Sequence, residues 1–323
     1  MMSRRCQCIS CILVSVFSVL NLSTLFNLMF FSYRRMNPVS FEKKQCMYTV
    51  ISLATFGSRI FKIGPTIQSL TKQTMLADLI VVNVALESRV GRVSEKSLFD
   101  YISSAFGPCV LSNHRKDYIH CLDNTLLFLI GPDYGPATKV LGTVKGLHSL
   151  DADTCIVSVD DDVVYDSRMV EVLVSIAPSD GALGFSCEEI PFGLEFVRHF
   201  DPSLLWWEII DKKNVIRFLY DEVVMCNGWL HGYQGILYRK SFFTDGVFSM
   251  NSTMPGGCFY ADDVRLAGYL WAKGIKRYVY PHFLTDGKDN LYHRENNESD
   301  SLNMIDNSMM EKQWPCVQYF GWY

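Results

Sequence analysis

Short, continuous apolar runs alternate with segments of helical periodicity along the first half of the chain. Four of these runs predict buried strands, because they lack the polar alternation of a sheet with one exposed face: CMYTVISLATF, DLIVVNVAL, TCIVSVD and ALGFSCEE. Four segments of helical spacing lie between or beside them: GPTIQSLTKQT, SEKSLFDYISSAF, ATKVLGTVKGLHSL and DSRMVEVLVSIA. Strands that alternate with helices of this length predict βαβ units, and therefore an α/β fold with a mostly parallel central sheet.

Boundary residues support several of these helices. Pro65 stands at a first helical position, where its missing N–H does no harm, and Ser94 is a candidate N-cap. Asp166 or Ser167 is the candidate cap of the last of the four helices. After about Glu188 the pattern loosens into aromatic and glycine-rich segments, and the last strand that it predicts is KRYVYP.

The N-terminal segment differs in kind, because no charged residue occurs between residues 9 and 33. The run Ile9–Phe31 exceeds the roughly 20 residues that a membrane-spanning helix requires, and no alanine precedes Ala54 to mark a cleavage site. We expect an uncleaved signal anchor, in a single-pass membrane protein of type II orientation that is Golgi- or ER-like if its source is eukaryotic. A buried helix of the globular domain is the alternative. The expected organisation is a tail (1–8), a transmembrane anchor (9–31), a stem (32–45) and one globular domain (46–323).

Composition and charge narrow the class of protein. Of the 323 residues 49% are hydrophobic, which suits a globular chain, and the formal net charge is -4. The chain shows no basic stripe of the kind that binds nucleic acids, so we expect no nucleic-acid partner. The eight cysteines that follow the N-terminal run show no C-x-x-C spacing, which argues against a zinc or redox motif. Cys155, Cys187 and Cys226 lie in apolar surroundings, which predicts buried thiols.

Three consecutive aspartates follow the strand TCIVSV. Ligands of an open parallel sheet bind at the carboxyl ends of its strands, which is where Asp160, Asp161 and Asp162 would stand. In extended backbone Asp160 and Asp162 would face one site and Asp161 would face away and tolerate change. Two converging carboxylates suit a hard divalent ion such as Mg²⁺ or Mn²⁺. The alternative is a solvated turn that caps the next helix.

A second acidic pair, Asp262 and Asp263, opens a segment of helical spacing, ADDVRLAGYLWAKG. Carboxylates are favoured at a helix N-terminus by the helix dipole, which is a sufficient structural explanation for the pair. The functional explanation is a general base that is held near a reacting hydroxyl.

Three further features are candidates for ligand contacts. The segment GWLHGYQG, with Gly232, Tyr233 and Gly235, is typical of a loop whose backbone approaches a flat ligand, although a tight turn explains it equally well. Lys139 falls in the first turn of a predicted helix, where a lysine is unfavourable unless an anion lies nearby. His282 follows the last predicted strand and is a candidate third metal ligand or a structural histidine.

In their order along the chain, these blocks resemble the glycosyltransferases of the GT-A fold, close to the family 2 type. The resemblance is carried by five blocks between about residues 47 and 283: VISLATFGSRIFKIGPTIQSLTKQT with DLIVVNV, YGPATKVLG, CIVSVDDDVVY, GYQGILYRKSFF and ADDVRLAGYLWAKGI. It implies a nucleotide-sugar-binding half (46–187) and an acceptor half (188–323). The chain departs from the family by lacking an evident Q-x-x-R-W signature after ADD, which argues for single-sugar addition rather than polymer synthesis.

The resemblance also implies roles for single residues on the donor side. The first block, with Thr55 and Arg59, would bind the nucleotide. The three aspartates would be the DxD motif, with Asp162 as a ligand of Mn²⁺ or Mg²⁺ on the diphosphate and Asp160 in contact with the ribose or the metal. Lys139 and Asp161 are further donor-side candidates.

On the acceptor side, the resemblance makes Asp263 the general base of an inverting transfer and places Asp262 where the family commonly has glutamate. The HGYQG segment would line the donor and acceptor sugars. His282 would complete the metal site, with His293 as a competitor for that role. The implied partners are a nucleotide-sugar donor, a glycan, glycoprotein or glycolipid acceptor, and the membrane. The alternatives are a retaining transferase, a nucleotidyltransferase, and a membrane-anchored carbohydrate-binding protein with a decayed transferase fold.

Overall fold

The computed structural model describes residues 39–88, 91–111, 118–122, 125–189, 223–280, 292–294 and 309–321. The chain divides into two compact units, Met1–Val39 and Ser40–Tyr323. Every helix and strand given below belongs to the second unit.

The expectation of a single-pass membrane protein needs correction. No helix within the described ranges combines the length and the apolar character that crossing a bilayer requires. The run Ile9–Phe31, on which that expectation rested, lies outside the described residues. A type II membrane anchor is therefore not supported.

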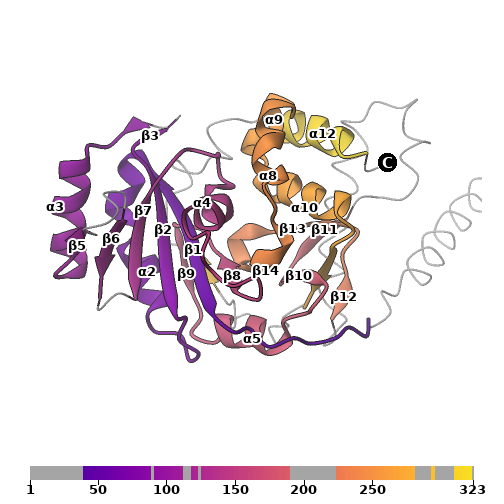
Figure 1. The fold of residues 1–323 in the computed structure, drawn as a ribbon, viewed down its shortest axis with the longest axis horizontal. Coiled ribbons are helices and arrows are strands. Elements are labelled where there is room, and N and C mark those ends of the chain that lie inside the picture. Colours follow the sequence, from indigo (N-terminus) through magenta and orange to yellow (C-terminus); the bar gives the residue numbers. More distant parts are fainter. Residues whose placement is uncertain are drawn as a thin grey trace, which may run out of the picture. The chain divides into compact units, whose positions relative to one another are not determined.

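A ten-stranded sheet forms the centre of the described fold (Figure 1). In spatial order its strands are β12 (Val224–Met225), β15 (Lys276–Val279), β10 (Gly181–Gly184), β14 (Ile236–Arg239), β8 (Cys155–Ser158), β1 (Thr49–Phe56), β2 (Leu79–Ala85), β7 (Leu126–Ile130), β6 (Tyr118–Cys121) and β5 (Val110–Leu111).

Most strands of the sheet run in one direction. β8, β1, β2 and β7 are mutually parallel neighbours, and β10 and β15 run parallel to each other in the same sense. β14 is inserted antiparallel between β8 and β10, β12 lies antiparallel to β15, and the β5–β6 hairpin closes the other edge. The predicted α/β fold with a mostly parallel sheet is confirmed, with antiparallel strands at these three places. β1 is buried along its whole length, as its continuous apolar run predicted.

Three small sheets accompany the main one. They pair β3 (Glu87–Ser88) with β4 (Gly91–Arg92), β9 (Val163–Tyr165) with β16 (Tyr292–Arg294), and β11 (Cys187–Glu189) with β13 (Gly228–Leu230).

Helices connect many of the strands along the chain, and several of them pack against the sheet. The α-helices are α2 (Gly64–Leu70), α3 (Glu95–Phe106), α4 (Thr138–Gly146), α5 (Met169–Ile176), α8 (Gly246–Ser249), α9 (Gly256–Tyr260), α10 (Asp262–Ala272) and α12 (Met309–Tyr319). The 3₁₀ helices are η1 (Gly57–Lys62), η3 (Gly232–Gln234), η4 (Lys240–Phe242) and η5 (Met250–Ser252). α4 packs against β1 and β2, whereas α9, α10 and α12 lie together at the opposite end of the unit from α3 (Figure 1).

The helix boundaries follow local chemistry. Pro65 lies in the first turn of α2, and the Ser94 hydroxyl accepts a hydrogen bond from the Ser97 N–H at the start of α3, so both predictions are confirmed. The cap predicted for the helix after the aspartates is wrong: α5 begins at Met169 after Arg168, without a side-chain cap.

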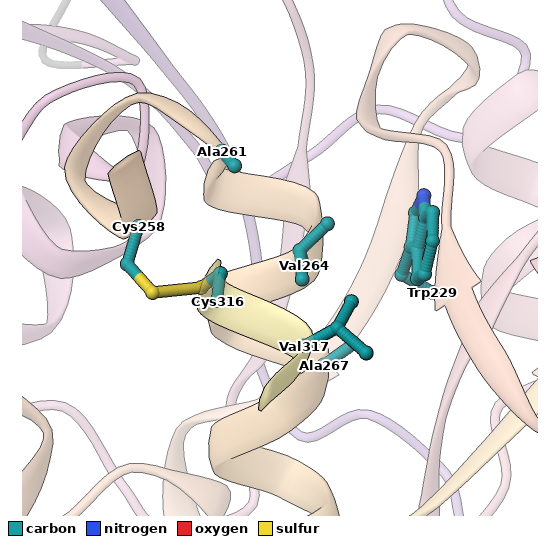
Figure 2. Close-up of a cluster of buried hydrophobic side chains, with 7 residues drawn as sticks. All are labelled: Trp229, Cys258, Ala261, Val264, Ala267, Cys316 and Val317. Atoms are coloured by element: carbon teal, nitrogen blue, oxygen red, sulfur yellow. A yellow bond between two sulfur atoms is a disulfide. The ribbon is translucent and has the colours of Figure 1, made fainter. Parts of the chain in front are cut away.

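α9, α10 and α12 enclose a separate apolar cluster, which Figure 2 shows. Trp229 of β13 packs there beside Val264 and Ala267 of α10, and a disulfide joins Cys258 of α9 to Cys316 of α12. This cluster fixes the helix that begins with the acidic pair. The sequence pattern did not predict α12.

All eight cysteines from Cys46 onward form disulfides. The pairs are Cys46–Cys155, Cys109–Cys121, Cys187–Cys226 and Cys258–Cys316. The prediction of buried free thiols at Cys155, Cys187 and Cys226 is therefore wrong. An apolar neighbourhood suits a buried disulfide as well as a buried thiol, so local sequence does not distinguish them.

Candidate active site

The order of the strands places one crevice at the centre of the sheet. From β1 the chain continues to β2 on one side, and after β7 it returns through α4 to β8 on the other side of β1. The crevice at the carboxyl ends of β1 and β8 is therefore a topological switch point, the usual ligand site of open α/β sheets. η1 with Arg59 follows β1 at this edge, and the three aspartates follow β8.

Arg59 joins the two strand ends electrostatically. Its guanidinium donates to Asp161 Oδ1 and lies 3.4 Å from Asp162 Oδ2. Burial raises the pKa of the Asp161 carboxyl to about 6, although the Arg59 charge opposes this shift. Asp161 Oδ2 is buried without a hydrogen-bond partner among the described residues. The Thr55 hydroxyl, at the end of β1, also lowers the pKa of Asp161, although its geometry falls short of a hydrogen bond.

The three aspartates do not alternate as extended backbone would have them. Residues 161 and 162 form a turn between β8 and β9, so Asp161 and Asp162 share Arg59 as a partner. Asp160 is directed instead to Lys139. The expectation that Asp161 faces away from Asp162 is wrong, because the turn breaks the two-residue period and both carboxylates meet Arg59. Asp161 is among the most buried of the acidic side chains and is not a position where we expect tolerance to change.

Lys139 connects the aspartate turn to the acidic pair of α10. Its Nζ lies 2.8 Å from Asp160 Oδ1 and 2.9 Å from Asp262 Oδ2, and its side chain is 8% exposed. Burial lowers the pKa of the Lys139 ammonium, but the charges of Asp160 and Asp262 outweigh burial and raise it well above its ordinary value. Two acidic motifs a hundred residues apart therefore meet at one buried cation.

Asp263 contacts the glycine-containing loop. Its Oδ2 accepts the Gly232 backbone N–H at 3.0 Å. A Cβ added at Gly232 would lie 2.6 Å from Lys139 Nζ and 2.7 Å from Asp263 Oδ1, so a larger residue would have to displace these charged groups. Burial and the neighbouring Asp262 raise the pKa of Asp263, and Lys139 opposes the rise.

The Tyr165 hydroxyl ties the aspartate turn to the same loop. It accepts the Asp160 N–H at 2.9 Å and donates to the Tyr233 carbonyl at 3.1 Å. Tyr165 is 3% exposed, and burial raises the pKa of its hydroxyl. The role of this residue was not predicted, and its only signal is a hydroxyl-bearing side chain at the end of the short strand VVY.

A buried polar network holds the start of α4, and with it Lys139. The Ser52 hydroxyl donates to the Lys139 carbonyl and lies 2.6 Å from Thr143 Oγ1. Asn83 donates to Ser52 Oγ at 3.1 Å and to Thr143 Oγ1 at 3.0 Å. Polar side chains in otherwise apolar strands are the sequence signal for such a network, because buried polar groups require partners.

Arg265 performs a similar positioning role for α10. It is fully buried one turn after Asp262, and its guanidinium donates to the Tyr134 carbonyl at 3.0 Å. Burial lowers the pKa of Arg265 to about 10, and the Asp262 carboxylate opposes that shift. The loop before α4 is thereby attached to the helix that carries the acidic pair.

Of the remaining candidates, two lie in the glycine-containing loop and two are histidines. Tyr233 lies in η3 with its ring stacked on His231 at a centroid distance of 5.7 Å, and Gly235 has a φ of 97°, which favours glycine. His282 lies outside the described residues, and His293 is described only as part of β16.

The donor atoms of the site suit a hard divalent ion in part. Carboxylate oxygens converge on the crevice, and Asp161 Oδ2 lacks a hydrogen-bond partner. Within the described ranges, no group of three or more His, Cys, Asp or Glu side chains is arranged to hold a metal. The chemistry therefore fits an ion that takes one or two carboxylates and fills its other positions with water or phosphate oxygens.

Comparison with known proteins gives no family assignment. No family model matches the chain, and no curated protein matches it. Among solved structures, a mycobacterial protein is similar at 13% identity and a TM-score of 0.43, over 85% of this chain and 75% of that chain. Two structures of glucosyl-3-phosphoglycerate synthase from Mycobacterium tuberculosis are similar at 11% identity. One, with Mn²⁺, UDP and glucosyl-3-phosphoglycerate, has a TM-score of 0.42 over 85% of this chain and 80% of its own. The other, with Mn²⁺, UDP-glucose and phosphoglyceric acid, has 0.41 over 86% and 80%. At these scores neither the family nor the substrate of this chain follows from the likeness.

Proposed function

We propose that the chain is a metal-dependent glycosyltransferase of the GT-A type that transfers one sugar from a nucleotide-sugar donor to an acceptor hydroxyl with inversion. The observation that carries the proposal is the ion pairing of Lys139 with both Asp160 and Asp262. It brings the aspartate turn, which would meet the donor, to the acidic pair, which would meet the acceptor. The meeting point lies beside the switch point of the sheet, where such ligands bind.

The donor side of the crevice would hold a diphosphate through its cations and its metal. Asp162 and Asp160 would hold Mn²⁺ or Mg²⁺, and the ion would neutralise the charge that develops on the departing nucleoside diphosphate. Arg59 and Lys139 lie beside these carboxylates and would add fixed positive charge toward the phosphates. Thr55, at the end of β1, would contact the nucleotide.

The acceptor side would hold the base. Asp263 Oδ2 is fixed by the Gly232 N–H, and its raised pKa suits a group that must take a proton near neutral pH. Asp263 would remove the proton of the acceptor hydroxyl as that oxygen attacks the anomeric carbon. Asp262, paired with Lys139, would keep the lysine in place. Gly232 and Tyr233 would line the sugars.

A panel of nucleotide sugars tests this proposal without knowledge of the acceptor. With Mn²⁺ present, we expect slow hydrolysis of one donor to free sugar and nucleoside diphosphate, and loss of this turnover with a chelator. Asp162→Ala should remove metal-dependent donor binding. Turnover of no donor, together with retained carbohydrate binding, would favour the non-catalytic alternative. The anomeric configuration of the first product, read by NMR, separates inversion from retention.

A further inference from the structure

Two neighbouring cavities lie along α4, and Lys139 lines neither of them. The first, of about 190 Å³, is lined on α4 by Thr138, Gly142, Lys145 and Gly146, a spacing that places them on one side of the helix. The second, of about 470 Å³, lies between the end of α4 and the η4–α8 segment. Lys145 lines both cavities.

Positive charge predominates around the larger cavity. Two lysines, Lys145 and Lys240, line it against one carboxylate, Asp245. The Lys240 ammonium is held by the carbonyls of His148, at 2.7 Å, and Leu150, and these carbonyls leave its charge uncompensated. Within the described ranges neither lysine has a carboxylate partner, whereas Lys44, Lys139 and Lys276 each do.

Aromatic rings stand beside these cations. Lys145 Nζ lies 5.1 Å from the centroid of the Phe248 ring, and that ring is 5.5 Å from Tyr134, which lines the smaller cavity. Phe243 adds a second ring to the larger cavity. Ring faces that adjoin polar and charged groups suit sugar rings, which present C–H groups on one side and hydroxyls at the edge. The two cavities, of about 190 and 470 Å³, together provide room for more than one sugar unit.

We propose that these two cavities form a binding site for an anionic oligosaccharide, whose acidic group pairs with Lys145 and whose sugar rings lie against Phe248 and Tyr134. The proposal does not depend on the proposed transfer reaction, because it rests on charge and shape along α4. The net charge of the chain is -4, so a polyanion is not attracted to the protein as a whole. Binding of one would therefore report a local cationic site.

Calorimetric titration of the full chain with a sulfated hexasaccharide derived from heparin tests the site. Maltohexaose serves as the neutral match and inorganic sulfate as the ion-only match. We expect the sulfated hexasaccharide to bind at least tenfold more tightly than either match. Lys145→Gln should weaken it about tenfold, a change of about 1.4 kcal/mol.

Lys96→Gln is the matched control, because Lys96 is also an exposed lysine on a helix but lies on α3 and lines neither cavity. It should leave the affinity unchanged. Both lysines are exposed, so neither substitution endangers folding. Equal affinity of the two variants, equal affinity for maltohexaose, or sulfate that binds as tightly as the hexasaccharide would each overturn the proposal.

Discussion

The backbone of Gly232 packs closely against two charged side chains, those of Lys139 and Asp263. We predict that Gly232→Ala lowers turnover at least tenfold, because its Cβ would displace Lys139 Nζ or Asp263 Oδ1 from positions 2.6 and 2.7 Å away. Turnover of the hydrolysed donor and the melting temperature are the two measurements. Gly256→Ala is the matched control, since nothing lies within 4 Å of its added Cβ. Equal activity of the two variants would contradict the tight packing inferred at Gly232.

The raised pKa of Asp263 predicts how the rate of the reaction depends on pH. Burial and Asp262 raise the pKa of Asp263 to about 8. A base acts only when ionised, so kcat/KM should rise between pH 6 and pH 9, and it should fall as pH drops below about 8. The measurement is kcat/KM for the donor at fixed Mn²⁺, which reports ionisation of the free enzyme. A rate that is flat or falls over this interval would contradict the assignment.

At the scale of elements, the Cys258–Cys316 disulfide fastens α12 to the helices behind the acidic pair (Figure 2). The chain-entropy model assigns about 4 kcal/mol of unfolding free energy to a loop of this length and about 3 kcal/mol to the 12-residue separation of Cys109–Cys121. We predict that replacing both cysteines of the first pair by serine destabilises the fold more than the same change in the second. Urea unfolding measures both. A reversed order would mean that α12 contributes little to holding α10.

Several elements could be predicted from local pattern alone. β1, β2, α3 and the start of α10 follow from continuous apolar runs, a serine cap and acidic residues at a helix start. β7 was missed because the β5–β6 hairpin and polar residues separate LLFLI from α3, so no helix directly precedes it to mark a further parallel strand beside β2.

The site itself was only partly predictable. Its residue types could be recognised from the two acidic motifs, and Lys139 from its misfit with the helix dipole. The ion pairs and hydrogen bonds of the site could not be predicted, because the turn at Asp161 and Asp162 redirects their side chains. Tyr165 and Arg265 also act through contacts with residues that are remote in sequence.

Four disulfides cross-link the described part of the chain, in addition to the hydrogen bonds of the central sheet. Cys46–Cys155 links the segment before β1 to the start of β8, and Cys109–Cys121 links the two ends of the β5–β6 hairpin. Cys187–Cys226 links β11 to the segment before β13, and Cys258–Cys316 links α9 to α12. Such a density is typical of chains that fold in an oxidising compartment. Of eleven cysteines, eight are paired, which leaves three, Cys6, Cys8 and Cys11. We predict at most three reactive thiols per chain in denaturant without reductant. Titration with a thiol reagent measures this, and eleven would contradict the pairing.

The central claim is that Asp263 takes the proton of the attacking hydroxyl while the donor is held elsewhere. Donor affinity and turnover of Asp263→Asn, measured side by side with Mn²⁺ and the donor that the wild-type chain hydrolyses, test it most directly. We predict turnover lower by about 10²- to 10⁴-fold, as expected for loss of a general base, with donor affinity nearly unchanged. Retention of more than about a tenth of the turnover, against that expected range, would show that Asp263 is not the base.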